Sequence, residues 1–474
     1  MANRTSEQQS KRRDRYYMLS LGCAKNTVDS ESMAQLLEGA GLHGTDDARR
    51  AEVLIVNTCG FINAAKEESL EALRELAAHK KSDQLLIAAG CLTQRYGAEI
   101  VARVPGLDGI IGTRRWMDIV DLVGKLRTRK HPEPIYHLPS DVLTVGSDEH
   151  GARRVSIQGA SAYLKIADGC RRPCAFCAIP LIKGTAVSRP IESIINEARL
   201  LRDHGTQELI LIAQDTTDYG HDLGMKDGLA ELLDRLTTDV PDLPWIRVMY
   251  AYPGAVTDRL IDIMATRPQI THYLDIPLQH GSRSMLLRMR RPANVEWVHQ
   301  TIGKMRTAIP DLAIRTTFIV GYPGETDAEF DELLQFVKTM QFDRVGTFTY
   351  SFEENTPSAD QANHLPEDVK IARRDALMAV QQNISLQRNQ AWVGQSIRVL
   401  TEGQGDGLTI ARSFRDAPEI DGLVLIDGEV PAGQLLDVRV TGAMTYDLTA
   451  TVERTGPYAI LPLPATERIP ILPQ

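Results

Sequence analysis

The sequence has few cysteines and no long hydrophobic run. Six cysteines among 474 residues are too few for a disulfide scaffold. No stretch approaches the ~18 consecutive apolar residues that span a membrane. The opening residues, MANRTSEQQSKRRDRYY, lack the apolar segment of a secretory signal. We therefore expect a cytoplasmic protein without a membrane segment, in which the thiols stay reduced and grouped cysteines serve as metal ligands or catalysts.

An excess of positive charge is also missing. The chain has 53 Lys+Arg against 62 Asp+Glu, which gives a net charge of −9. This balance disfavours nucleic-acid binding by bulk charge and favours a basic partner. Hydrophobic residues at 43% and charged residues at 24% are typical of a folded globular protein. The length suggests about three domains.

The first part of the chain alternates apolar strands with helical patterns, which predicts a parallel sheet covered on both faces. The expected strands are 16–22, 51–57, 84–90 and 108–112. Cys23, Cys59 and Cys91 each follow one of the first three strands. Because the carboxyl ends of parallel strands share one edge, we expect the three thiols to converge. Buried thiols of the core are the alternative, which three occurrences at strand ends disfavour. This region spans 14–128, and a polar connection with several prolines spans 129–160.

A second alternation occupies 161–390 and predicts six βα units curled into a partial barrel, with chemistry on the loops beyond the strands. Thr326 and Glu329 fit a capping box at the start of its last βα helix. The expected strands are 162–168, 208–215, 246–250, 273–277, 313–321 and 344–350.

The last part of the chain changes to short β segments with glycine turns. After a polar helix at 366–390, five such segments predict a small OB-like barrel over 391–460, followed by a tail at 461–474. From 391 to 474 the chain has six arginines, no lysine and eleven acids, a balance of −5. A barrel that grips RNA needs a basic groove, whereas an acidic one suits a basic protein. A merely solvated acidic surface is the alternative.

The strongest motif is Cys170, Cys174 and Cys177, spaced C-x3-C-x2-C directly after the first strand of the second alternation. Three thiolates can hold three irons of a four-iron cluster and leave the fourth iron open to another ligand. A structural zinc site is the alternative, but it needs four protein ligands, and no fourth Cys or His stands in this loop.

This loop in a sixfold βα repeat resembles the radical S-adenosylmethionine superfamily. The resemblance implies that S-adenosylmethionine binds the open iron and is cleaved to a 5′-deoxyadenosyl radical. It also implies that Phe176 packs near the cofactor and that the segment 314–325, IRTTFIVGYPGE, contacts it. Cys170, Cys174 and Cys177 are then the catalytic cluster ligands.

The flanking regions sharpen the resemblance. The strings LGCAKNTVDSE, NTCGFI and AAGCLTQRY, the central core and the terminal barrel, which is similar to a TRAM domain, resemble the methylthiotransferases. In that family Cys23, Cys59 and Cys91 correspond to ligands of a second 4Fe-4S cluster, which is the sulfur side of the reaction. The implied cofactors are therefore two 4Fe-4S clusters and S-adenosylmethionine.

Further strings resemble the RimO branch, which modifies an aspartate of the small-subunit ribosomal protein S-twelve. They are IADGCRRPCAFCAIPLIKG, AQDTTDYG, AYPG, YLDIPLQHGS and RSFRDAPEIDG. The implied partners are this basic protein, free or on the small ribosomal subunit, and an electron donor. Methylthiolation of transfer RNA and a non-catalytic ribosome-associated iron–sulfur protein are the alternatives.

The implied reaction removes hydrogen from the β-carbon of the target aspartate and delivers a methylthio group. An unactivated C–H bond explains the need for a radical cofactor, because no side-chain base can remove that hydrogen. Five polar residues near strand ends are further candidates for contact with cofactor or substrate, or are ordinary loop residues: Gln214, Asp215, Gln279, His280 and Arg315.

Overall fold

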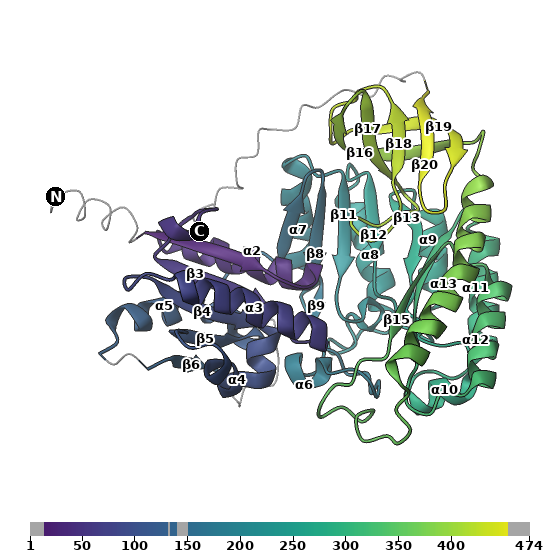
Figure 1. Ribbon diagram of the computed structural model, residues 1–474. Coiled ribbons are helices and arrows are strands. Elements are labelled where there is room, and N and C mark those ends of the chain that lie inside the picture. The colour runs from purple at the N-terminus through teal and green to yellow at the C-terminus, as the bar shows by residue number, and fades with distance from the viewer. Residues whose placement is uncertain (1–13, 131–132, 140–149, 454–474) are drawn as a thin grey trace.

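The chain forms two α/β parts and a small β-barrel (Figure 1). The computed structural model describes residues 14–130, 133–139 and 150–453. The expected tail at 461–474, the last residues of the expected barrel region and part of the expected connection lie outside the described residues.

The first part contains a six-stranded sheet in the order β2-β1-β3-β4-β5-β6, with every neighbouring pair parallel. The strands are β1 (Arg15–Ser20), β2 (His43–Gly44), β3 (Val53–Thr58), β4 (Leu85–Gly90), β5 (Gly109–Gly112) and β6 (Ile135–His137). The four expected strands are present, and β6 is a short strand within the connection at 129–160. Strand β2 was not expected, because two residues are too short to give a period-2 pattern.

Helices cover both faces of this sheet. On one face, Met33 and Leu37 of α2 (Ala24–Gly39) pack with Leu122 of α5 (Ile119–Thr128). Helices α3 (Asn63–His79) and α4 (Cys91–Arg103) supply apolar residues to the other face. The strands are therefore almost wholly apolar, as a sheet buried on both faces requires.

The second part is an open, curved sheet in the order β15-β14-β13-β12-β11-β8-β7, in which β7 is antiparallel and the other six strands are parallel. Its strands are β7 (Val155–Gln158), β8 (Ser161–Lys165), β11 (Glu208–Ile212), β12 (Trp245–Val248), β13 (Ile270–Asp275), β14 (Ala313–Val320) and β15 (Arg344–Thr349). A separate pair joins β9 (Ala167–Asp168) to β10 (Val187–Ser188). The expected partial barrel is confirmed.

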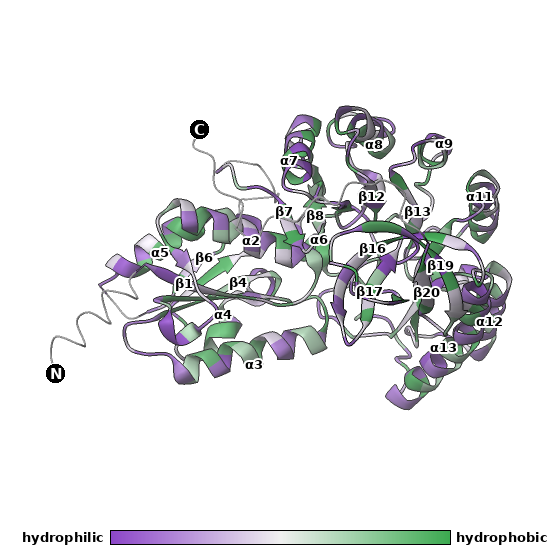
Figure 2. Cartoon of the chain, turned by 90° about the horizontal axis from the view of Figure 1, so that it is seen from above, coloured by the Kyte–Doolittle hydropathy of each residue, from purple (hydrophilic) through white to green (hydrophobic). Residues whose placement is uncertain are grey.

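Helices form an arc around the outside of this curved sheet, as the view from above shows (Figure 2). They are α7 (Ile191–Asp203), α8 (Gly228–Asp239), α9 (Asp258–Thr266), α11 (Val295–Ala308) and α12 (Asp327–Met340). The capping box is confirmed, because the Thr326 hydroxyl accepts from the Glu329 amide and the Glu329 carboxylate accepts from the Thr326 amide. The division of the chain into domains at 14–128, 161–390 and 391–460 stays our proposal. The connection expected at 129–160 contains two strands, β6 of the first sheet and β7 of the second.

The inner face of the curved sheet receives residues from both other parts. Val28 of α2 and Ala417 of the terminal barrel pack against Tyr163, Ile210 and Tyr273 on the inner face. Val28 comes from the amino-terminal part, and Ala417 comes from the loop 414–423 of the barrel. The inside of the partial barrel is therefore closed by both neighbours.

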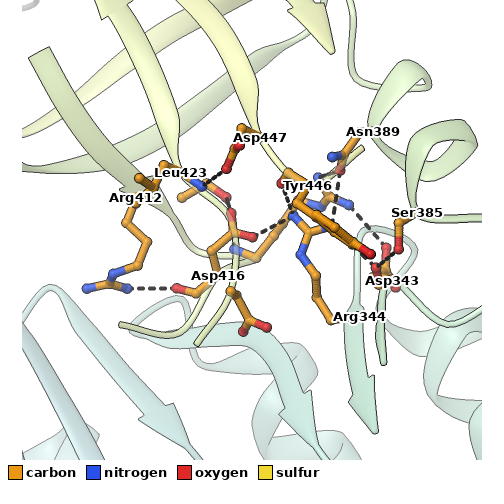
Figure 3. Close-up of polar contacts among 12 residues, drawn as sticks. Asp343, Arg344, Ser385, Asn389, Arg412, Asp416, Leu423, Tyr446 and Asp447 are labelled. Atoms are coloured by element: carbon orange, nitrogen blue, oxygen red, sulfur yellow. Dashed lines mark hydrogen bonds and ion pairs between the residues drawn. The ribbon is translucent and has the colours of Figure 1, made fainter. Parts of the chain in front are cut away.

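The third part is a closed five-stranded barrel in the order β16-β17-β18-β20-β19, preceded by α13 (Glu367–Gln390). Its strands are β16 (Ser396–Gly405), β17 (Leu408–Ser413), β18 (Val424–Asp427), β19 (Leu435–Ala443) and β20 (Leu448–Val452). Buried ion pairs fasten it to the core: Arg344 Nη2 donates to Asp416 at 2.7 Å (Figure 3), and Arg415 Nη2 to Asp343 at 3.1 Å.

None of the helices within the described residues is both long and apolar enough to cross a membrane.

Candidate functional site

The three amino-terminal cysteines lie together at the carboxyl edge of the first sheet. Cys23 precedes the first turn of α2, Cys59 follows β3, and Cys91 is the first residue of α4 after β4. A Cβ added at Gly22, whose φ is +94°, would lie 2.8 Å from the Cys59 Cβ, so only glycine lets these segments approach. The pKa of Cys91 is raised to about 12, chiefly by burial and also by the nearby Cys23 and Cys59, although Lys183 acts to lower it.

The second group of cysteines lies on the loop after β9. Burial raises the pKa of Cys170 to about 11 and that of Cys177 to about 12, with Cys174 close to both. The Cys170 amide donates to the Gly184 carbonyl at 3.0 Å, which closes the loop. A Cβ at Gly169, whose φ is +77°, would lie 2.0 Å from the Thr185 oxygen.

The two groups of cysteines meet at the boundary between the α/β parts. Cys91 packs against Ala178 and Ile182, and Ala178 directly follows Cys177. Ile182 belongs to α6 (Ile179–Lys183), the short helix that lies beside α4 (Figure 1). A ligand bound by one loop therefore lies next to a ligand bound by the other.

The thiols of neither group surround a single metal-ion position in the described residues. Across the described ranges, no three His, Cys, Asp or Glu side chains converge closely enough to hold one metal ion. In a four-iron cluster each thiolate binds a separate iron, so this convergence is not required. Because the raised pKa values keep the buried thiols protonated, loading with iron must displace protons.

A cationic and aromatic cluster lies beside the second loop. Arg291 Nη1 lies 3.4 Å from the Cys174 sulfur, and the guanidinium groups of Arg172 and Arg291 lie 4.2 and 4.3 Å from the ring centroid of Tyr252. Arg172 Nε also donates to Asp215 at 2.7 Å. Sequence reasoning missed Arg291 as a site residue, since it stands in no motif near the cysteines, and singled out Tyr252 only as part of AYPG.

Phe176, between the last two cysteines, packs against the segment that the resemblance assigns to the cofactor. It contacts an apolar cluster that contains Tyr322, with Ile319 packed against the same cluster. Both residues belong to the segment 314–325. The cysteine loop therefore packs against this segment through Phe176.

The five polar candidates fall into two classes. Asp215 pairs with Arg172, His280 lies 2.9 Å from Glu325 within the core, and Arg315 donates to Asp275 at 2.9 Å. These three have protein partners. The carboxamide oxygens of Gln214 and Gln279 are buried without a partner in the described structure. Gln279 also has a φ of +75°, a strained conformation that is typical of functional sites.

Two buried ionic contacts join the α/β parts beside the thiols. Arg95 Nη1 donates to Glu353 at 2.7 Å, and the other Glu353 oxygen accepts from the Asn63 amide at 3.1 Å. Lys183, which also contacts Asp168, lies 3.2 Å from Asp29 of α2. Sequence reasoning missed these contacts, because the partners that join the two parts come from distant segments.

Three family descriptions match successive parts of the chain. Residues 15–112 match the Uncharacterized protein family UPF0004, residues 164–337 match the Radical SAM superfamily, and residues 393–452 match the TRAM domain. Among solved structures, the radical S-adenosylmethionine methyltransferase TsrM from Kitasatospora setae has a TM-score of 0.55 at 12% identity. The match covers 70% of this chain and 72% of that chain, and it is a likeness of fold.

Sequence relatives match nearly the whole chain. The Ribosomal protein uS12 methylthiotransferase RimO of Chloroflexus aurantiacus is 49% identical over 449 residues, which cover 92% of this chain and 98% of that protein. The protein of the same name from Symbiobacterium thermophilum is 46% identical, covering 93% of this chain and 91% of that protein. The chain therefore belongs to the RimO family of ribosomal protein uS12 methylthiotransferases.

Proposed function

We propose that this protein is a radical S-adenosylmethionine methylthiotransferase, which adds a methylthio group to the β-carbon of an aspartate in ribosomal protein uS12. The observation that carries the proposal is the match at 49% identity over 92% of the chain, together with two adjacent groups of three thiols. The cytoplasm is the proposed location, because the six thiols must stay reduced.

Each group of three thiols is proposed to hold one 4Fe-4S cluster. Cys170, Cys174 and Cys177 would bind the cluster that receives S-adenosylmethionine, and Cys23, Cys59 and Cys91 would bind the cluster on the sulfur side. Bound there, these groups would supply the one-electron chemistry that an unactivated C–H bond requires.

The chain's own residues orient and enclose the reactants. Phe176 would pack near the cofactor, and the unpartnered oxygens of Gln214 and Gln279 can accept hydrogen bonds from a bound ligand. Arg291 places a positive charge beside Cys174. Val28 and Ala417 extend the apolar cluster on the inner face of the curved sheet from its two neighbouring parts.

The acidic barrel supports a basic protein substrate. Asp406, Asp427 and Glu429 lie near one another at the end of the β16–β17 hairpin, since the Gly407 amide donates to Glu429 at 3.3 Å and Leu408 pairs with Asp427. All three acids are exposed. An electron donor is also required, because cleavage of S-adenosylmethionine consumes one electron.

The test is reconstitution of the full chain with iron, sulfide, S-adenosylmethionine and a reductant, with uS12 and transfer RNA offered in parallel. We expect a mass increase of uS12 by one methylthio group and formation of 5′-deoxyadenosine. If only transfer RNA gains the methylthio group, the substrate is RNA and the proposed protein substrate is wrong. Absence of both products from iron-loaded protein would favour a non-catalytic role.

A further inference from the structure

Four charged side chains form a closed ring at the boundary between the α/β parts. Lys165 donates to Asp29 and lies 3.1 Å from Asp168, while Lys183 lies 3.2 Å from Asp29 and 3.0 Å from Asp168. Each ammonium group therefore contacts both carboxylates. No side chain of this quartet is more than 3% exposed.

The quartet joins the segments that carry the thiols. Asp29 lies on α2, the helix that begins directly after Cys23. Asp168 ends β9, two residues before Cys170, and Lys183 ends α6, the helix that follows Cys177. Asp29 thus follows the first group of thiols in the chain, whereas Asp168 and Lys183 flank the second group.

Lys183 is also adjacent to the first group of thiols. It lies close enough to Cys91 to act on that thiol electrostatically, and the preceding residue, Ile182, packs against Cys91. The quartet therefore lies beside Cys91 as well as beside the second thiol loop.

Stability alone does not account for four buried charges. Replacing buried ion pairs by apolar packing is often neutral or stabilising, because the charges lose their hydration. The neighbouring Val28 already provides apolar contact with the core at this boundary. Apolar packing tolerates small displacements of the two parts, whereas ion pairs near 3 Å fix the direction and distance between the charged groups that they join. The quartet therefore adds a defined separation between the two thiol loops.

We propose that the Asp29, Lys165, Asp168 and Lys183 quartet is a positioning device that holds the two thiol loops at the separation needed for transfer of the methylthio group. This inference rests on the proposed function. Removal of the substrate hydrogen breaks one C–H bond, and that hydrogen leaves in 5′-deoxyadenosine. The carbon radical and a methylthiolate then form one C–S bond and return the electron that cleaved S-adenosylmethionine.

The separation matters for only one of these two stages. Formation of 5′-deoxyadenosine depends on the second thiol loop alone, whereas C–S bond formation needs both loops. A misplacement of 1 Å can cost about 100-fold in rate. Loss of the quartet should therefore uncouple the stages, so that more 5′-deoxyadenosine forms for each methylthio group transferred.

The test uses the full chain reconstituted with both clusters, in the wild type and in Lys183→Met, which removes one ammonium group. Lys183→Arg keeps the charge, and Asp29→Asn is a second variant that perturbs the quartet from the other side. Asp108→Asn is the matched control, because Asp108 is 8% exposed and pairs with Lys80 and Arg129 inside the amino-terminal part. Three quantities are measured: iron per chain, the dipolar coupling between the reduced clusters by pulsed EPR, and the ratio of 5′-deoxyadenosine to methylthiolated uS12.

We expect Lys183→Met and Asp29→Asn to keep their iron, to change the dipolar coupling, and to raise the ratio by about 10- to 100-fold. Lys183→Arg should restore most of the coupling, and Asp108→Asn should match the wild type. Unchanged coupling and ratio in both quartet variants would overturn the proposal, as would an equal change in Asp108→Asn. A wild type that makes no methylthio product would refute the proposed function, while the dipolar measurement would still test the quartet.

Discussion

One of the buried carboxylates at the contact between the terminal barrel and the core is Glu208. Its side chain is fully buried and accepts from Arg247 Nε at 2.7 Å, from Arg412, and from the Ser161 hydroxyl at 3.0 Å. Burial raises the pKa of Glu208, but Arg412 and Arg247 outweigh it and lower the pKa from 4.5 to about 2. That difference corresponds to about 3 kcal/mol in favour of the charged form.

Glu208→Gln would leave two buried guanidinium groups without a charged partner. Breaking a buried ion pair costs about 3–5 kcal/mol. The low end applies here, because Arg247 still donates to the Phe414 carbonyl and Arg412 to the Asp416 carbonyl, each at 2.8 Å. About 3 kcal/mol raises the population of the undocked barrel by about 100-fold.

Hydrogen exchange measured by mass spectrometry reads this population directly. Amides in the loop 414–423 should exchange about 100-fold faster in Glu208→Gln, while those of β3 and β4 keep the wild-type rate. Glu402→Gln is the control, since Glu402 accepts from the same arginine but is 34% exposed, and it should change little. The reasoning is wrong if the loop exchanges at the wild-type rate in Glu208→Gln. Because the pKa of Glu208 is lowered, its contribution is complete above pH 4.5 and is lost as the pH falls toward 2.

Three further predictions concern the thiol loops. Cys59→Ala and Cys170→Ala should each lose half of the iron and retain the other cluster, and a chain that keeps all of its iron in either variant would contradict the assignment. Alkylation of Cys170 in the iron-free protein should accelerate about tenfold per pH unit from pH 8 to 10, because its pKa is raised to about 11, and a plateau near pH 9 would contradict this. Gly169→Ala should lose only the second cluster, since its Cβ would clash with the Thr185 oxygen 2.0 Å away, and an iron content equal to the wild type would refute the steric argument.

Local patterns were sufficient to predict the strands and the places where thiols follow them. The apolar run before Cys59 becomes β3, and the run before Cys91 becomes β4, because a parallel strand covered on both faces must be almost entirely apolar. The same reasoning placed three cysteines at one edge. Their assignment as cluster ligands stays a prediction.

The contacts between the parts could not be predicted, because each depends on two distant segments. Asp29 and Lys165 are 136 positions apart, and Arg95 and Glu353 are 258 positions apart. Lys183 stands within the string IADGCRRPCAFCAIPLIKG, but the string does not reveal that its side chain is buried between two carboxylates, as it is in the structure. The site is thus built from predictable strand ends and from long-range ion pairs that hold those ends together.

The charge of the terminal barrel serves two separate contacts. Arg412, Arg415 and Asp416 are buried in ion pairs with the core, and the carboxylate of Asp421 lies 3.4 Å from Arg315 on its inner face. These residues dock the barrel (Figure 3) and present no charge to a partner. On the described surface of the barrel, Arg398 and Arg439 pair with acids, and Asp406, Asp427 and Glu429 lie beside the exposed side chains of Leu408 and Ile410. Such an acidic and apolar surface favours a basic protein over an RNA backbone, in line with the proposed substrate. Of the four arginines in the described barrel, two hold it to the core and the other two are paired with acids, so none is left to pair with a phosphate.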